Sequence, residues 1–415
     1  MVKNKFLKYS FLLIFVSCIS KIMALIIKIF ETRILDFKVI SMVSLLFPTF
    51  NILTTLSLFG TPLATQILIS KNKYNNKDIL ITNIIISLII SILISIFMLM
   101  FSNFYIYNIL KEDKLIKAYK TLIFILPFTC ISGNLRGYFN GKSRYNITSI
   151  SSILEYIIKL IITITLFPIL NKLSISESVL IIFLLNIVYE SISILFMSFF
   201  MNKDKGIFNK DIAINEKSII FSFTFKELIN SFTMFLEPII ITNFYNNIIR
   251  DKYLYMINYN TPLLLAPSFI TLSIAPLLIT SISKGNKDKN KSILKKTSIF
   301  ILFISIIYLI ILTEFDRKLV YLIFKVKGPS FIKEFPFTFI LLYLENIFST
   351  FFDAVSKSKI NLYLSILSCI VRSLSLILLS YFNFGINSYI YSLNINIVIT
   401  FVIQIYFLNK ILFSQ

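Results

Sequence analysis

The chain is a succession of long apolar stretches separated by short polar segments. A helix that crosses a membrane needs about 20 mostly apolar residues, and twelve stretches of the sequence fit that length. They are residues 8–30, 40–69, 79–103, 119–138, 147–170, 178–201, 218–245, 260–283, 296–314, 331–355, 360–382 and 386–409. The pattern predicts an all-α polytopic membrane protein with about twelve transmembrane helices.

Composition agrees with this prediction and narrows the function. Hydrophobic residues make up 57% of the 415 residues and charged residues 15%, against about 25% charged residues in soluble domains. The sequence has no histidine and three widely spaced cysteines, which argues against a metal site, a His-based catalytic triad and a disulfide framework. The short loops leave no room for the acidic or His-bearing domain of a membrane glycosyltransferase. We therefore expect no enzyme, no cofactor and no metal.

The distribution of Lys and Arg predicts the orientation in the membrane. With the N-terminus inside, the inner segments carry more basic residues than the outer loops, which favours two cytoplasmic termini in a multi-pass protein of the cytoplasmic (plasma) membrane. No small-residue cleavage site follows the first apolar run, so we expect it to be retained as a helix. The net charge of +21 reflects either attraction to an anionic partner or a general lysine excess. Because no basic stretch lies in a soluble domain, we expect no nucleic-acid partner.

An internal repeat is visible in the loops and prolines. Residues 139–146 echo residues 354–361 at an offset of 215, and Pro48 and Pro62 are echoed by Pro267 and Pro276 at offsets of 219 and 214. The repeat predicts two parallel six-helix lobes, 1–205 and 206–415, an architecture in which transporters hold their cargo between the halves.

Ionisable residues interrupt the apolar runs, where a charge facing lipid costs a few kcal/mol. These residues are Lys21, Lys28, Glu155, Lys159, Glu190, Lys226, Glu227, Glu237, Glu345, Asp353 and Arg372. A chain with so many of them is expected to enclose something polar. Lys226 and Glu227 lie near the predicted inner end of their helix and are alternatively interfacial.

Spacing assigns tentative roles to several of these charges. Lys21 and Lys28 are two turns apart and share a helix face, which suits an anionic partner, although Lys28 could instead extend to the interface. Glu155 and Lys159 are four apart and can pair as a structural ion pair. Glu345 and Asp353 share a face of the helix before Arg372 and are its nearest counter-charges. Glu190 lies one turn from Asn186.

The acids and the prolines complete the predicted site. The candidate cavity or ion-coupling residues are Glu155, Lys159, Glu190, Glu237, Glu345 and Asp353, with Na⁺ or H⁺ as the coupling ion. Proline bends a membrane helix and frees a carbonyl, so matching broken helices point to a transport pathway. The candidate hinge residues are Pro48, Gly60, Pro62, Pro127, Pro238, Pro267 and Pro276.

Several segments resemble one transporter family. They are Ser20-Lys21 to Lys28, Pro48 to Ala64, Arg136-Gly-Tyr-Phe-Asn-Gly141, and Pro267 to Lys284. The sequence is similar to the polysaccharide-transporter family of stage V sporulation protein B-like flippases, within the superfamily of MATE-like exporters. The resemblance implies a V-shaped, two-lobed bundle that moves lipid-linked, pyrophosphate-bearing glycans outward by alternating access. Lys21 and Lys28 match the basic positions of the family's first helix. Typical members have about fourteen helices, and Ala24 stands where they usually carry glycine.

The leading hypothesis is a flippase for a lipid-linked oligosaccharide or polysaccharide precursor of the cell envelope or spore cortex. Lys21, Lys28, Arg136 and Arg372 are the candidate phosphate-binding residues. Its partners would be the anionic lipid-linked glycan, membrane lipids and envelope-synthesis proteins, and we expect a monomer. A cation-coupled multidrug antiporter of the MATE type and a non-transporting scaffold of the envelope machinery are the alternatives.

Lys21→Ala is predicted to abolish complementation of a flippase-deficient strain, because it removes the central cation of the first helix. Expression of the variant, measured in membranes, should be unchanged. Normal complementation would exclude a role for Lys21 in binding the cargo.

Overall fold

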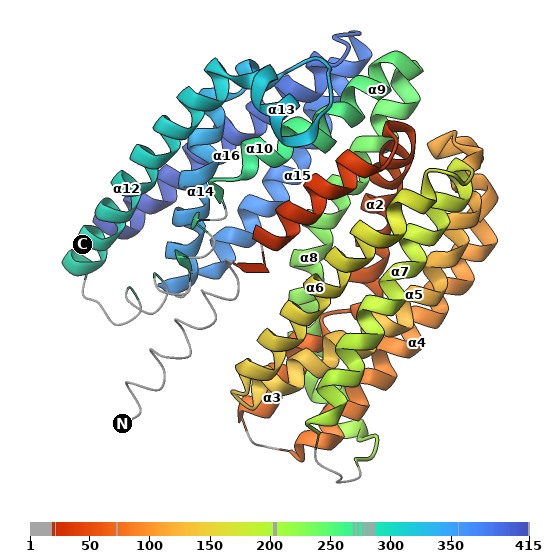
Figure 1. Ribbon diagram of the computed structural model, residues 1–415. Helices are drawn as coiled ribbons and strands as arrows, with labels where there is room; N and C mark the ends of the chain where they lie inside the picture. The colour runs from red at the N-terminus through yellow and green to blue at the C-terminus, as the bar shows by residue number, and fades with distance from the viewer. Residues whose placement is uncertain are drawn as a thin grey trace. The chain divides into compact units, whose positions relative to one another are not determined.

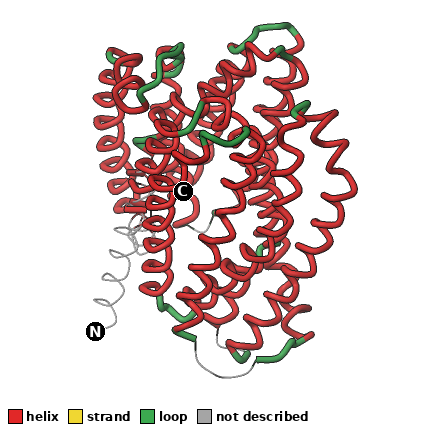
Figure 2. The backbone as a smooth tube through the Cα atoms, turned by 45° about the vertical axis from the view of Figure 1, so that its right-hand side comes forward, coloured by secondary structure: helices red, strands yellow, loops and turns green. Residues whose placement is uncertain are grey.

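The computed structural model describes the chain as helices joined by short connections (Figure 1). The description covers residues 19–20, 22–71, 74–201, 206–268, 270–271, 274–275, 278, 282, 287–355 and 357–413. No strand occurs among these residues (Figure 2). The all-α polytopic architecture expected from the sequence is confirmed.

The chain divides into two compact units. The first unit is Ile26–Ile239, and the second is Ile240–Gln415 together with Met1–Leu25. The expected lobes, 1–205 and 206–415, differ from these units because most of α8 belongs with the first unit. The six-helix lobes themselves remain a prediction.

The helices of the first unit are α2 (Phe37–Leu58), α3 (Thr61–Lys71), α4 (Asn76–Asn103), the π-helix η1 (Phe104–Leu110), the 3₁₀-helix η2 (Asp113–Leu115), α5 (Ile116–Gly141), α6 (Tyr145–Leu170), α7 (Ile175–Phe199) and α8 (Lys210–Phe244), which continues into the second unit. The second unit contains α9 (Asn247–Tyr255), the π-helix η3 (Met256–Asn260), α10 (Thr261–Leu265), α12 (Lys287–Glu314), α13 (Asp316–Phe324), the 3₁₀-helix η4 (Ile332–Glu334), α14 (Pro336–Ala354), α15 (Ser358–Tyr381) and α16 (Asn387–Phe413).

Eight helical segments within the described residues are long and apolar enough to cross a membrane. They are Phe37–Lys71, Asn76–Leu110, Asp113–Gly141, Tyr145–Leu170, Ile175–Phe199, Asp288–Glu314, Lys359–Tyr381 and Asn387–Leu412. Each coincides with an expected span. At two further expected spans the chain forms α8 and α14, which are not among the eight. The expected spans 8–30 and 260–283 lie largely or partly outside the described residues.

Helix α4 shows how a lipid environment inverts the usual helix pattern. Its apolar side chains, such as Leu93, Phe97 and Met100, are exposed, whereas Ser87 and Ser91 are buried. In a soluble protein the apolar face would be the buried one. The outward apolar face therefore suits contact with lipid, and small polar residues mediate the packing between helices.

A single joint breaks the second expected membrane helix. Phe59 and Gly60 both have left-handed φ, of 46° and 64°, and separate α2 from α3. A Cβ on Gly60 would lie 2.7 Å from the Ile220 carbonyl oxygen of α8, so the position requires glycine for its φ and for its packing. Pro48 lies inside the continuous helix α2. The break is therefore at the glycine and not at that proline.

The other candidate hinge prolines divide into three groups. Pro127 and Pro238 lie within the continuous helices α5 and α8. Pro62 is in the first turn of α3, and Pro267 follows the end of α10 in a turn with Ala266. Pro276 lies outside the described residues. The hinge role of all these prolines and the matching breaks expected in the two halves stay predictions.

A row of glycines lets α5 pack closely against α3. Gly133, Gly137 and Gly141 are spaced by four residues and lie on one face of α5. A Cβ on Gly137 would lie 2.2 Å from the Pro62 carbonyl oxygen, and one on Gly141 would lie 2.8 Å from the Ile69 Cβ. Small residues at this spacing bring membrane helices into backbone contact. The seam fixes α3 against α5 immediately after the joint.

A buried hydrogen-bond network reinforces the seam. The Asn134 amide donates to the hydroxyls of Thr61 and Ser87, each at 3.1 Å, and accepts from the Thr65 hydroxyl at 3.1 Å. Asn83 donates to Thr65 at 2.9 Å. All five side chains are fully buried. Polar groups buried in this way cost free energy unless they are paired, so the network holds α3, α4 and α5 in one arrangement.

The internal repeat is a repeated helical hairpin. In the α5–α6 turn, Lys142 and Arg144 donate their backbone N–H groups to the carbonyls of Tyr138 and Phe139. In the α14–α15 turn, the N–H groups of Val355 and Lys357 donate to Phe351 and Phe352. Each bond recurs 213 residues later, whereas the residues of the motif match at an offset of 215.

Gly137→Ala is expected to destabilise the protein by about 1–3 kcal/mol, the usual cost of overpacking. The added Cβ meets backbone, which cannot move aside. Thermal unfolding in detergent measures the change. Gly133→Ala is the matched control, because its Cβ would meet a movable Leu58 methyl at 2.8 Å and alanine favours the helix. Equal unfolding temperatures for the two variants would contradict the seam.

Candidate functional site

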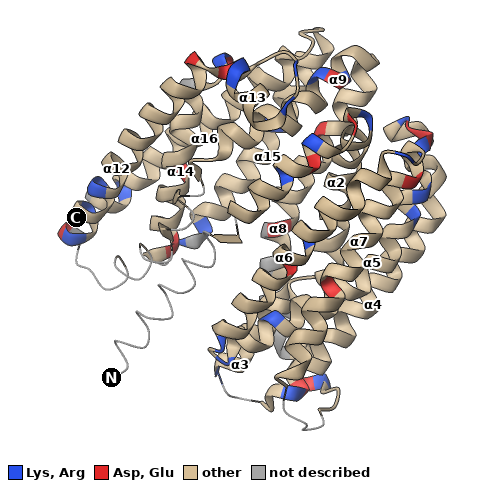
Figure 3. Cartoon of the chain, in the orientation of Figure 1, with Lys and Arg blue, Asp and Glu red and all other residues tan. Residues whose placement is uncertain are grey.

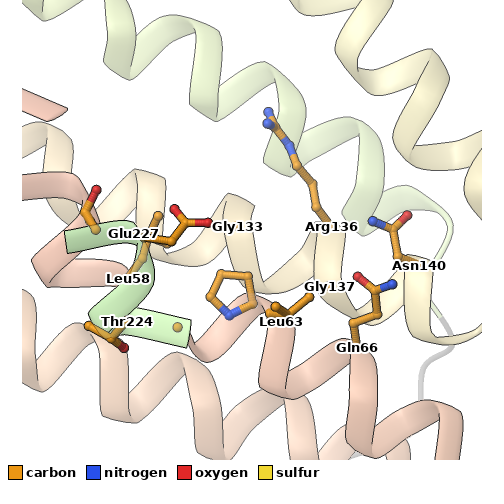
Figure 4. A pocket seen from close by; sticks show the side chains of 12 residues that line it. Leu58, Leu63, Gln66, Gly133, Arg136, Gly137, Asn140, Thr224 and Glu227 are labelled. Carbon is orange, nitrogen blue, oxygen red and sulfur yellow. The ribbon is translucent and has the colours of Figure 1, made fainter. Parts of the chain in front are cut away.

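A cavity of about 330 Å³ opens inside the first unit beside the joint between α2 and α3. Four helices contribute to it (Figure 4). Its polar lining residues are Thr55, Gln66, Arg136, Asn140, Thr224 and Glu227. Gln66 of α3 and Asn140 of α5 lie side by side, while Thr224 and Glu227 come from α8 (Figure 4). The cavity therefore combines a cation, a carboxylate and neutral hydrogen-bonding groups.

Arg136 connects the cavity to a cluster of charges between α5, α6 and α7. Its Nη2 donates to Glu155 Oε2 at 2.6 Å and to the Ser193 hydroxyl at 3.2 Å. Glu190 Oε2 lies 3.9 Å from the same Nη2. The Ser193 hydroxyl is in turn 2.7 Å from that of Ser151. One cation thus faces two carboxylates, and the cluster carries a formal excess of one negative charge when both are ionised.

The cluster is only partly enclosed and only partly hydrogen-bonded. The side chains of Arg136, Glu155 and Glu190 are 33%, 25% and 18% exposed. Arg136 Nε and Glu190 Oε2 are shielded and make no hydrogen bond. Arg136 therefore has donor capacity left over, and a second carboxylate stands near its first one.

The predicted pairing of Glu155 with Lys159 is wrong. Glu155 pairs with Arg136, and Lys159 instead places its Nζ 5.5 Å from the centre of the Tyr189 ring. Neighbours four apart on a helix interact by only about 0.2–0.5 kcal/mol, whereas a charge-assisted arginine–carboxylate bond is stronger. The packing of α5 and α6 onto α7 makes the stronger contact available.

The predicted pairing of Arg372 with Glu345 or Asp353 is also wrong. Arg372 is 3% exposed, donates to the Tyr389 carbonyl at 3.3 Å and the Ser392 hydroxyl at 3.2 Å, and stacks on the Tyr389 ring. Glu345 accepts from Thr400, and Asp353 accepts from Asn361 at 2.8 Å. The reason is that α15 packs mainly against α16, so Arg372 reaches α16 and not α14.

The remaining predicted residues are placed as follows. Lys28 is half-buried and lies within electrostatic range of Glu31 and Lys159. Glu237 is half-buried on α8, directly before Pro238. Asn186 donates to the backbone of its own helix and not to Glu190. Lys21 and the Lys226 side chain lie outside the described residues. No structural finding tests the roles predicted for these residues.

The repeat provides a comparison for the charge cluster within the same chain. At the offset of 213 residues, Ser349 and Ser368 occupy the positions equivalent to Arg136 and Glu155. The Ser368 hydroxyl accepts from Asn396 of α16 at 3.0 Å, and no ion pair joins Ser349 and Ser368. The hairpin fold therefore does not require the ion pair.

Two sequence features indicate the cavity, although the spacing of charged residues does not. Gly133, Arg136, Gly137 and Asn140 are spaced as one face of a helix, and all four line the cavity. Glycines four apart mark the close packing of α3 on that face. Glu227 also lines the cavity, where an interfacial position was the alternative. No local pattern pointed to Gln66 or Thr224.

Comparison with known proteins identifies relatives of the chain. The model of a family described as polysaccharide biosynthesis protein matches residues 6–250. Stage V sporulation protein B of Bacillus subtilis (strain 168) is 22% identical over 400 residues, which cover 90% of this chain and 77% of that protein. The residues that line the cavity lie within both matches.

Solved structures of MATE transporters share the fold. An inward-facing multidrug resistance MATE family transporter of the MOP superfamily superimposes with a TM-score of 0.77 at 13% identity, covering 95% of each chain. An outward-facing one gives 0.65 at 12% identity, covering 98% of this chain and 95% of the other. At these identities the likeness concerns the fold alone.

A double-mutant cycle of Arg136→Gln and Glu155→Gln is expected to give a coupling free energy of about 0.5–3 kcal/mol. Each single variant should destabilise the protein by leaving a charge without its partner. Thermal unfolding of the purified protein in detergent measures the cycle.

The matched control is the cycle of Glu155→Gln and Lys159→Gln, for which we expect a coupling near zero. Larger coupling in the control than in the Arg136 cycle would restore the pairing along α6.

Proposed function

We propose a transport function for this chain, which belongs to the polysaccharide biosynthesis protein family. The chain is a multi-pass membrane protein with the fold of MATE transporters. Its proposed cargo is a lipid-linked, phosphate-bearing saccharide precursor of the cell envelope or spore cortex, moved outward by alternating access. The description of the family supports a saccharide cargo over other anionic lipids, and the name of the sporulation relative supports a role in spore formation.

Arg136 is the observation that carries the proposal. It is a partly exposed cation on a membrane-spanning helix, and it lines a cavity that holds neutral hydrogen-bonding groups. A guanidinium binds phosphate oxygens through two parallel N–H bonds. Asn140 and Gln66 offer amide groups of the kind that bind sugar hydroxyls. The cavity alone is small for a lipid-linked glycan, so it would hold the phosphate and the first sugar contacts.

Exchange of partners would give Arg136 a transport cycle. In the structure Arg136 pairs with Glu155, and Glu190 lies 3.9 Å away. A phosphate that binds Arg136 would displace Glu155 and leave two carboxylates without their cation. A proton or Na⁺ could neutralise them, which would couple cargo binding to ion binding. Lys21 and Lys28 remain proposed contributors to phosphate binding, while the buried Arg372 is better suited to a structural role.

A cation-coupled multidrug antiporter is the second candidate. The excess of one carboxylate in the cluster around Arg136 favours it, because a cationic drug or coupling ion would be stabilised there. A permanent arginine in the same cluster argues against a cationic cargo, so the anionic cargo is preferred. A scaffold without transport activity would need neither the cavity nor the charges that line it.

Location and partners follow from the transport proposal. We propose the cytoplasmic membrane, with both termini cytoplasmic, and a monomer that works beside envelope-synthesis proteins. The anionic glycan lipid and bulk membrane lipids would be its ligands. The proposal includes no cofactor, no nucleic acid and no catalytic reaction.

Arg136→Gln is expected to reduce translocation of a lipid-linked oligosaccharide by at least about tenfold, since it removes a charge-assisted phosphate contact. Arg136→Lys should retain part of the activity, because lysine binds phosphate as a point charge without the fork. Reconstituted vesicles with a fluorescent lipid-linked oligosaccharide measure the rate.

Gln66→Ala and Asn140→Ala are expected to weaken apparent cargo affinity while leaving the folded protein intact. Export of cationic dyes by the same vesicles is the counter-test. Unchanged saccharide translocation by Arg136→Gln, with dye export lost in Glu155→Gln, would replace the saccharide proposal with the antiporter.

A further inference from the structure

A second, smaller cavity lies in the second unit, outside the membrane-spanning helices. It measures about 150 Å³ and lies between α9, α13 and the segment that follows α13. Its lining contains Arg317 and Lys327 with the rings of Tyr255 and Tyr321. A water occupies about 30 Å³ of liquid, so the cavity has room for a phosphate group. Its lining holds two cations and no carboxylate.

Packed aromatic and aliphatic side chains form the inner wall of this cavity. Val320 and Phe324 are buried on the inner face of α13, and the Phe324 ring lies 5.5 Å from that of Tyr259. Tyr259 in turn lies 4.7 Å from Tyr255. A Cβ on Gly328 would lie 2.3 Å from the Tyr255 ring. The basic segment is therefore held against α9 by contacts that only a glycine at 328 permits.

Two lysines lie near the Tyr321 ring at this cavity. The Nζ atoms of Lys325 and Lys327 lie 5.5 and 5.9 Å from the centre of the Tyr321 ring, as cation–π contacts. Among the residues that the structure describes, neither lysine nor Arg317 forms an ion pair with a carboxylate. Figure 3 shows blue Lys and Arg positions on α13 and beside it. The positive charge is thus available to an anionic ligand.

The exposed side of α13 is apolar next to these cations. Phe315 and Leu322 are seven residues apart, are 49% and 64% exposed, and flank Arg317 in the sequence. A short helix with apolar residues outward and cations beside them suits the boundary between lipid headgroups and acyl chains. Basic residues there attract anionic lipid with about 1 kcal/mol each.

We propose that Arg317, Lys327 and Tyr321 form a binding site for the phosphate group of an anionic membrane lipid. The apolar residues Phe315 and Leu322 would anchor α13 among the lipids around that headgroup. The site is independent of the transport function and of the cavity at Arg136. The shared chemistry is a phosphate, and the test separates a lipid headgroup from a free phosphate.

The chain has no tryptophan, so Leu322→Trp provides a single fluorescent reporter beside the site. The full-length variant is reconstituted in nanodiscs of phosphatidylcholine, with or without a minority of phosphatidylglycerol brominated on its acyl chains. We expect brominated phosphatidylglycerol to quench the tryptophan more strongly than the same amount of brominated phosphatidylcholine. In the Arg317→Gln, Lys327→Gln background, this preference should fall by roughly tenfold or more.

The matched control removes the same number of charges nearby. Lys318→Gln with Lys333→Gln leaves the lining of the cavity unchanged and should keep most of the preference. Inorganic phosphate that displaces the brominated lipid at millimolar concentration would support the phosphate site and show that free phosphate also binds. Equal quenching by the two brominated lipids, or equal loss in the control pair, would overturn the proposal.

Discussion

Polar groups in the membrane-spanning part of this chain must find partners inside the protein, and the structure depends on that constraint. Hydrocarbon offers no hydrogen bonds, so an unpaired buried group costs several kcal/mol. The serines of α4 satisfy it locally: Ser87 and Ser91 donate to carbonyls three residues earlier. Asn134 satisfies it between helices, by joining α3, α4 and α5. These hydrogen bonds hold α3, α4 and α5 against one another.

Two arginines meet the same constraint in different ways. Arg372 is buried and its charge is balanced by neutral dipoles and a tyrosine ring. Arg136 is partly exposed and faces carboxylates. Arg136 borders a cavity, whereas Arg372 is enclosed by the protein. Arg136 is therefore the better candidate for a binding residue, and Arg372 is the better candidate for a structural residue.

The sequence predicts the helices well and their side-chain partners poorly. Apolar stretches alone located eight segments that form helices long and apolar enough to cross a membrane, because hydropathy is a local property. The partner of Glu155 depends on how α5, α6 and α7 pack, which one-dimensional spacing does not contain. The same holds for Arg372, since spacing favours α14 but packing favours α16. The helix breaks at Gly60 because this residue has a left-handed φ. A prediction of breaks from proline positions does not detect such a residue.

The repeat allows the two helical hairpins to be compared within one chain. Where the copies agree, as in the backbone bonds of the α5–α6 and α14–α15 turns, the shared fold accounts for the residues. At the same offset, Arg136 and Glu155 stand opposite Ser349 and Ser368. The ion pair is therefore a feature of the first copy that the shared turn geometry does not account for.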